Sequence, residues 1–132
     1  MTKHEITQAF LQGRNCAQCV FSTYAEELGF DPEESDRIAA LFGGGMEMGQ
    51  TCGAVTGALM AIGLMGGGRQ EAEAFKQEFR ALHSSCMCRE LIRYDFSDPK
   101  QAQAARESGI LMDYCPALVE SACEIIDRIM ER

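Results

Sequence analysis

Cysteine is the residue type in this 132-residue chain that could do redox or metal chemistry, because seven cysteines are present against two histidines. Four of the cysteines are expected at or near the start of a helix. A helix start carries exposed N–H groups and the positive end of the helix dipole, so it stabilises a thiolate and lowers the pKa of a cysteine there. The thiolate is the form that attacks disulfides and binds metal ions. The candidate catalytic residues are therefore Cys16, Cys52, Cys88 and Cys115.

Cys52 ranks first among the four because of the residues around it. The glycine run 43–45 and Gly49 precede it and form a pliable loop whose amides could fold over an anion or a sulfur atom. This loop fits neither the dinucleotide-binding nor the Walker pattern. Small residues line the helix expected after Cys52, so another backbone can approach closely and bring a second helix start with its cysteine near Cys52. These small residues are Gly53, Ala54, Gly57, Ala58 and Ala61.

The remaining cysteines have weaker signals. Cys19 forms a C-x-x-C with Cys16, a spacing used by dithiol oxidoreductases and by half of many zinc sites, but the strand context of a thioredoxin-like protein is missing. Cys86 is separated from Cys88 by one residue, which differs from a common zinc knuckle. Cys123 is expected inside a helix as a structural residue. His83 is interpreted as a helix-end histidine rather than a catalytic base.

Composition limits the classes of partner. The chain has 20 acidic and 12 basic residues and a net charge of −8, which disfavours nucleic acids and anionic membrane surfaces. The most apolar stretch, residues 54–65, is too short to span a bilayer, and no targeting segment is recognised. Seven cysteines without a secretory signal favour reduced thiols. We therefore predict a cytoplasmic protein with no nucleic-acid or membrane partner.

The elements that must position the cysteines are predicted to be helices, since alternating strand patterns are nearly absent. We expect an all-α fold, one domain over residues 1–132, built as a compact bundle of about six to seven helices. Four polar residues are candidate helix caps: Asn15, Asp31, Thr51 and Asp98. The expected helices span residues 2–12, 16–28, 32–42, 52–64, 69–82, 99–107 and 113–132, and residues 88–92 are expected to form a short turn or helix. In the fifth, Phe75, Phe79 and Leu82 form the core-facing stripe.

The order of these motifs resembles the C_GCAxxG_C_C family of redox-active proteins. The resemblance covers residues from about 5 to 128 and rests on residues 15–18, 43–46, the Cys-Gly-Ala-x-x-Gly box of residues 52–57, the Cys-Arg-Glu-Leu of residues 88–91, and Cys115. It implies that these same four cysteines carry a redox activity and that Cys19, Cys86 and Cys123 lie outside the shared pattern. A module similar to this one accompanies an iron–sulfur centre in split-Soret cytochromes.

Two functional hypotheses stay open at this level, and neither decides whether the protein is an enzyme. In the first, the helix-start thiols perform thiol–disulfide chemistry with an unidentified redox partner. In the second, Cys16, Cys52, Cys88 and Cys115 together hold an iron–sulfur cluster or zinc as the cofactor, since four thiolates are the usual complement for either. A helical interaction protein with incidental cysteines is a third alternative. The small-residue helix could also serve a homodimer interface.

Overall fold

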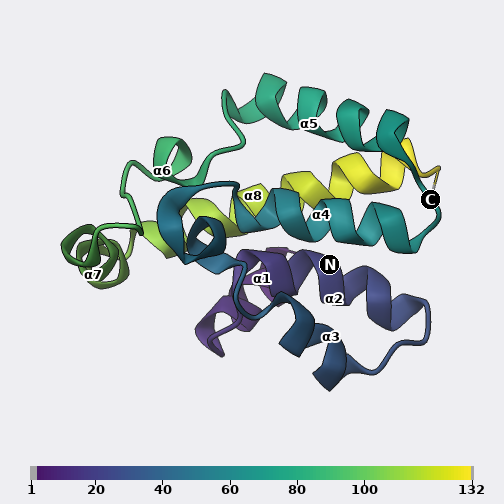
Figure 1. The fold of residues 1–132 in the computed structure, drawn as a ribbon. Coiled ribbons are helices and arrows are strands. Elements are labelled where there is room, and N and C mark those ends of the chain that lie inside the picture. Colours follow the sequence, from purple (N-terminus) through teal and green to yellow (C-terminus); the bar gives the residue numbers. More distant parts are fainter. Residues whose placement is uncertain (1–2, 132) are drawn as a thin grey trace.

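The computed structural model describes residues 3–131 and consists of helices joined by short loops (Figure 1). Within that range there are nine helical segments and no strand, so the prediction of an all-α fold is confirmed. Seven of the segments have at least eight residues, in agreement with the expected six to seven helices. The segments are α1 (Lys3–Leu11), α2 (Cys16–Glu27), α3 (Pro32–Ala39), η1 (Gly45–Gly49), α4 (Gly53–Leu64), α5 (Arg69–His83), α6 (Cys88–Leu91), α7 (Pro99–Ser108) and α8 (Ile110–Ile129).

The helices are arranged in layers around α4 and α8 (Figure 1). The α5 helix packs on one side of α8, while α1 and α2 pack on the other side of the α4–α8 pair, and α3 lies outside α2. The α6 and α7 helices both lie at one end of the molecule, on the left in Figure 1, near the start of α8. The loops that connect α5, α6, α7 and α8 are at this end, so it is where a site could form.

The core explains why α4 and α8 are central. In α4 the buried side chains are small or apolar, and Ala58 and Ile62 are at most 1% exposed. In α8 the apolar stripe is fully buried through Val119 and Ile125. The α5 helix contributes Phe75 and Phe79 to the core, as expected, but Leu82 is 62% exposed. The predicted stripe therefore ends one turn early, because the last turn of α5 extends past the core.

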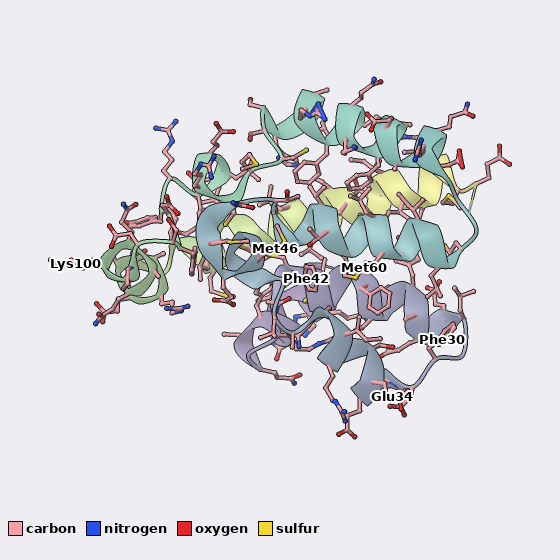
Figure 2. All side chains as sticks on the ribbon, viewed as in Figure 1. Phe30, Glu34, Phe42, Met46, Met60 and Lys100 are labelled. Carbon is pink, nitrogen blue, oxygen red and sulfur yellow. The ribbon has the colours of Figure 1, made fainter. Side chains whose placement is uncertain are left out.

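A second, smaller apolar cluster joins α2 to α3 and to one face of α4. Figure 2 shows Phe42 and Met60 between these helices. They pack against buried Phe21 and three buried alanines, Ala17, Ala25 and Ala39. Met60 thus serves as a core-filling residue, which is the common use of this flexible side chain.

Three of the four predicted caps are confirmed. Asn15 accepts a hydrogen bond from the Gln18 amide at 2.8 Å, and the Gln18 side chain accepts from the Asn15 amide, which completes a capping box. Asp31 and Asp98 accept from backbone amides at the starts of α3 and α7, each of which begins with proline. These caps fix where α2, α3 and α7 begin.

The fourth prediction, that Thr51 caps α4, is wrong. Thr51 lies in an isolated antiparallel bridge with Met87, and Cys52 itself occupies the cap position of α4. The α3 helix ends at Ala39 rather than near Phe42, since the Asn15 side chain donates to the carbonyl of Ala40 at 2.9 Å. That contact takes up a carbonyl at the end of the helix.

Candidate functional site

The starts of α2 and α4 lie against each other because two glycines of α4 have no side chain. A Cβ atom on Gly53 would lie 3.1 Å from Cys16 Cβ and 3.0 Å from the Ala17 amide nitrogen. A Cβ atom on Gly57 would lie 2.8 Å from the Ala17 carbonyl oxygen. The expectation that small residues bring a second helix start and its cysteine near Cys52 is therefore confirmed, and the partner is Cys16.

Backbone hydrogen bonds hold the segment containing Cys88 beside Cys52. The Cys52 amide donates to the Cys86 carbonyl at 2.7 Å, and the Cys88 amide donates to the Gln50 carbonyl at 2.6 Å. These two bonds flank the bridge between Thr51 and Met87. They fix the start of α6 at the start of α4.

The glycine loop before Cys52 forms a left-handed turn. Gly44, Gly45, Met46 and Glu47 all have φ between 60° and 65°. Left-handed backbone costs about 1 kcal/mol for a residue with a side chain, so the surroundings must hold Met46 and Glu47 in this conformation. The turn packs closely on α6, since a Cβ atom on Gly45 would lie 2.8 Å from Cys88 Cβ. The loop therefore closes over Cys88 and carries Glu47 to the site.

Cys115 is not at a helix start, which corrects the sequence prediction. The α8 helix begins at Ile110, directly after Gly109, which also ends α7 in a left-handed conformation. Ile110 and Leu111 pack against the main core, so tertiary contacts hold a first turn that the proline signal does not predict. Pro116 consequently lies inside the helix and cannot donate an amide hydrogen bond.

All four predicted cysteines line one cavity of about 450 Å³. They come from the starts of α2, α4 and α6 and from the second turn of α8. Each is buried, with 3–7% of its surface exposed. Most of the remaining wall is apolar, and its charged side chains are Arg14, Glu47 and Arg106. The structure thus brings together four thiols that are distant in the sequence.

The thiols of Cys16 and Cys115 titrate as an interacting pair. Hydrogen bonding between the two side chains favours the form in which Cys16 keeps its proton and Cys115 is the thiolate. This bond lowers the pKa of Cys115 below its ordinary value despite burial. The same bond, followed by burial, raises the pKa of Cys16 well above its ordinary value. Cys115 is therefore the thiol that ionises first.

Cys52 and Cys88 behave differently from the prediction based on helix starts. Burial, with a smaller contribution from negative charge at Cys115, raises the pKa of each to about 12. Amides of Ala54 and Val55 donate toward the Cys52 sulfur and offset part of this effect. Loss of hydration outweighs the helix dipole at these positions, because the sulfur atoms are almost completely removed from water. Both side chains are neutral thiols near neutral pH.

The mouth of the cavity carries residues that sequence reasoning missed. Arg106 of α7 lies over the ring of Phe96, with its guanidinium carbon 5.2 Å from the ring centroid. Its Nη2 atom is 3.5 Å from Glu47 Oε2, and both side chains are at least half exposed. No local signal distinguishes Arg106 from other surface residues of a polar helix. Only the placement of α7 against η1 brings it to the site.

The other cysteines and His83 lie away from the cavity wall. Cys19 and Cys123 are buried, and burial is the largest cause that raises the pKa of each. Cys86 is half-buried, and its carbonyl, rather than its sulfur, contacts Cys52. His83 ends α5 and packs against Phe79 at 4.7 Å between ring centroids, as expected for a helix-end histidine.

Two further observations concern metals and membranes. Among residues 3–131, no three His, Cys, Asp or Glu side chains are grouped closely enough to hold one metal ion. In the same part of the chain, no helix is both long and apolar enough to cross a bilayer.

A family model described as "Putative redox-active protein (C_GCAxxG_C_C)" matches residues 14–129, a range that contains all four cavity cysteines. Among curated proteins and solved structures, none matches the chain significantly.

Proposed function

The chain belongs to the C_GCAxxG_C_C family of redox-active proteins, and from this membership and the cavity geometry we propose that it is a thiol–disulfide redox protein. The observation that carries the proposal is that Cys16 and Cys115, which titrate as an interacting pair, line the wall of one cavity. Two thiols on one cavity wall are candidates for a disulfide if their Cα atoms can come within about 7 Å of each other. Sequence reasoning ranked Cys52 first, but the lowered pKa of Cys115 favours Cys115 as the attacking thiolate.

The proposed reaction is exchange with a disulfide substrate. The Cys115 thiolate attacks one sulfur of the substrate disulfide, forms a mixed disulfide and releases the other sulfur as a thiolate. Cys16 then loses its proton and attacks the Cys115 sulfur, which releases the second substrate thiolate. One released thiolate takes up the proton that Cys16 loses, and the other takes up from solvent the proton that Cys115 gave up when it ionised. The protein dithiol is thus oxidised to a disulfide while the substrate disulfide is reduced to two thiols.

Cys52 and Cys88 support this chemistry as neutral neighbours. A charge on either would repel the Cys115 thiolate, and their raised pKa values keep that charge absent at neutral pH. They hold the cavity wall in place through the backbone bonds that join residues 50–52 to residues 86–88. We assign them a positioning role rather than a covalent one.

The test is a thiol count combined with peptide mapping. Mild oxidation of the reduced protein with a diazene oxidant is expected to remove two of the seven thiols and to link the peptides of Cys16 and Cys115. Cys115→Ser should abolish the loss, whereas Cys123→Ser, in the same helix but outside the cavity wall, should leave it unchanged. Seven free thiols in the oxidised wild-type protein would overturn the proposal.

An iron–sulfur cluster or zinc at Cys16, Cys52, Cys88 and Cys115 is the second candidate, supported by the single cavity that all four line. Such a group would supply one-electron transfer as a cluster, or structural crosslinking as zinc. The described side chains are not gathered around a single ion, so the support for zinc is weaker. Anaerobically purified protein with visible absorption and stoichiometric iron would favour the cluster. Colourless, metal-free protein that forms the disulfide would favour the dithiol.

Several expectations stay predictions beside this proposal. They are a single domain over residues 1–132, a cytoplasmic location, the absence of a nucleic-acid partner, a homodimer, and a separate redox partner that reduces the disulfide again. The acidic composition supports the prediction about nucleic acids, since phosphates would be repelled.

A further inference from the structure

The depth of the four thiols limits what can reach them. Their surfaces are 3–7% exposed, and they lie in the wall of a cavity rather than on a projecting surface. A disulfide bond is about 2 Å long, so an exchanging sulfur must come into direct contact with Cys115. A disulfide held on the surface of a folded protein would have to bring its backbone into the cavity as well.

The size of the cavity fits a small molecule. Its volume of about 450 Å³ is within the range of ligand pockets, roughly 300–1,000 Å³. Its wall is mainly apolar, with Phe10, Leu91 and Leu118 among the lining residues. Such a wall accommodates the aliphatic and sulfur atoms of a low-molecular-weight disulfide.

The charges around the cavity identify the polar groups of that molecule. Arg106 and Glu47 line the mouth on opposite elements, and their 3.5 Å ion pair is long and half exposed, so it is weak and can exchange partners. A guanidinium binds a carboxylate, and a carboxylate binds an ammonium group. Arg14, also in the wall, pairs through Nη2 with Asp36 at 2.8 Å, and its buried Nε atom has no hydrogen-bond partner within the described residues. The wall therefore offers one cationic and one anionic side chain that can exchange partners, Arg106 and Glu47, and one unpartnered donor, Arg14 Nε.

We propose that the substrate of this cavity is a small disulfide of the amino-acid type, whose carboxylate pairs with Arg106 and whose ammonium group pairs with Glu47. The inference rests on the proposed dithiol function and names its substrate class. Glu47 belongs to the left-handed turn that packs on Cys88, so it lies at the end of the cavity that holds this thiol. The guanidinium of Arg106 lies over the Phe96 ring, which also lines the cavity. These two residues bind and orient the substrate, while Cys115 and Cys16 carry the exchange.

A single-turnover assay with pre-reduced protein tests this assignment without a physiological reductant. The probes are cystine, which has both charged groups; cystamine, with ammonium only; dithiodipropionate, with carboxylate only; bis(2-hydroxyethyl) disulfide, with neither; and insulin as a protein disulfide. Each rate is divided by the rate of the same disulfide with dithiothreitol, which removes differences in intrinsic reactivity. Cystine is expected to give the highest normalised rate and insulin the lowest.

Two variants separate recognition from chemistry. Arg106→Gln is expected to lower the rates with cystine and dithiodipropionate about tenfold, which is the size of one lost charge-assisted contact, and to leave bis(2-hydroxyethyl) disulfide unchanged. Glu47→Gln should lower the rates with cystine and cystamine. The matched control is Arg128→Gln, which removes another exposed arginine that pairs with Glu78 at 2.7 Å on the opposite side of the core. It should change none of the rates.

The outcomes distinguish the two proposals. If no probe, including the neutral disulfide, reacts with the reduced wild-type protein, the dithiol function is overturned and this inference falls with it. If the neutral disulfide reacts but Arg106→Gln slows all probes equally, or insulin reacts as fast as cystine, the substrate assignment alone is overturned. Circular dichroism of Arg106→Gln and Arg128→Gln confirms that both variants are folded in the comparison.

Discussion

At the residue scale, the pair formed by Cys16 and Cys115 divides two chemical roles between identical side chains. Both residues are buried, each with 7% of its surface exposed, so burial alone would raise the pKa of both thiols. The hydrogen bond breaks this symmetry, because one thiol donates and the other accepts. The acceptor becomes the nucleophile, and the donor keeps the proton until the second step. The interaction between the two side chains thus makes Cys115 the attacking thiol and Cys16 the resolving thiol.

Removal of the donor should show this division of roles. In Cys16→Ala the Cys115 thiolate loses its hydrogen bond while burial remains, so the pKa of Cys115 should rise. The rate of Cys115 alkylation by iodoacetamide, followed by mass spectrometry of its peptide between pH 6 and pH 10, should fall at neutral pH and reach its plateau at higher pH. Cys123→Ala, in the same helix, is the control and should keep the wild-type profile. An unchanged profile in Cys16→Ala would remove the basis for the assignment of Cys115.

At the element scale, the approach of α2 to α4 depends on Gly57. A methyl group there would lie 2.8 Å from the Ala17 carbonyl oxygen, which is backbone and cannot rotate away. Gly57→Ala should therefore separate the helices and lower the free energy of unfolding by about 1–3 kcal/mol. Gly63→Ala, one and a half turns along the same helix, has no atom within 4 Å of the new methyl group. It should raise the free energy of unfolding by about 0.5–1 kcal/mol, as measured by urea unfolding. A free energy of unfolding of Gly57→Ala that equals or exceeds that of the wild-type protein would contradict this packing.

The elements also show which parts of the fold sequence reasoning could predict. Asn15, Asp31 and Asp98 were found as caps because each acts on an amide two or three residues away. The prediction that Thr51 is a cap was wrong because its partner, Met87, is distant in the sequence. The predicted start of α8 was wrong because core contacts of its first turn outweigh the position of Pro116. Local signals thus predicted helices, and long-range packing decided the exceptions.

Of the candidate site, too, only part could be predicted from the sequence. The motif pattern identified Cys16, Cys52, Cys88 and Cys115, and all four line the cavity. The contact between Cys16 and Cys115 could not be predicted, since it depends on how α8 packs beside α2. Arg106 and Glu47 were missed for the same reason, as each is an ordinary charged residue until α7 and η1 meet.

At the scale of the whole molecule, the buried thiols should make stability depend on alkaline pH. Cys52 and Cys88 have pKa values raised to about 12, so the folded state keeps protons that the unfolded chain loses above about pH 8.5. The free energy of unfolding should be unaffected below that pH and fall as pH rises from about 8.5 to 12, by at most about 1.4 kcal/mol per pH unit for each thiol. Urea unfolding under reducing conditions at pH 7.5 and pH 9.5 measures the fall.

Two variants control this measurement. Cys52→Ala should be less stable at pH 7.5 because a buried side chain is lost, but its stability should fall less steeply with pH. Val55→Ala, which also truncates a buried side chain of α4, should keep the wild-type pH dependence. Equal slopes in the two variants would show that Cys52 does not titrate on unfolding.

Oxidation should change the stability of the whole molecule in the opposite direction. A disulfide between Cys16 and Cys115 would join the start of α2 to α8 and close a loop of about 100 residues, which restricts the unfolded chain and stabilises the folded state by up to about 4–5 kcal/mol. The oxidised wild-type protein should therefore unfold at a higher urea concentration than the reduced protein. Cys16→Ala should show no such difference. An oxidised protein less stable than the reduced one would mean that the disulfide forms elsewhere.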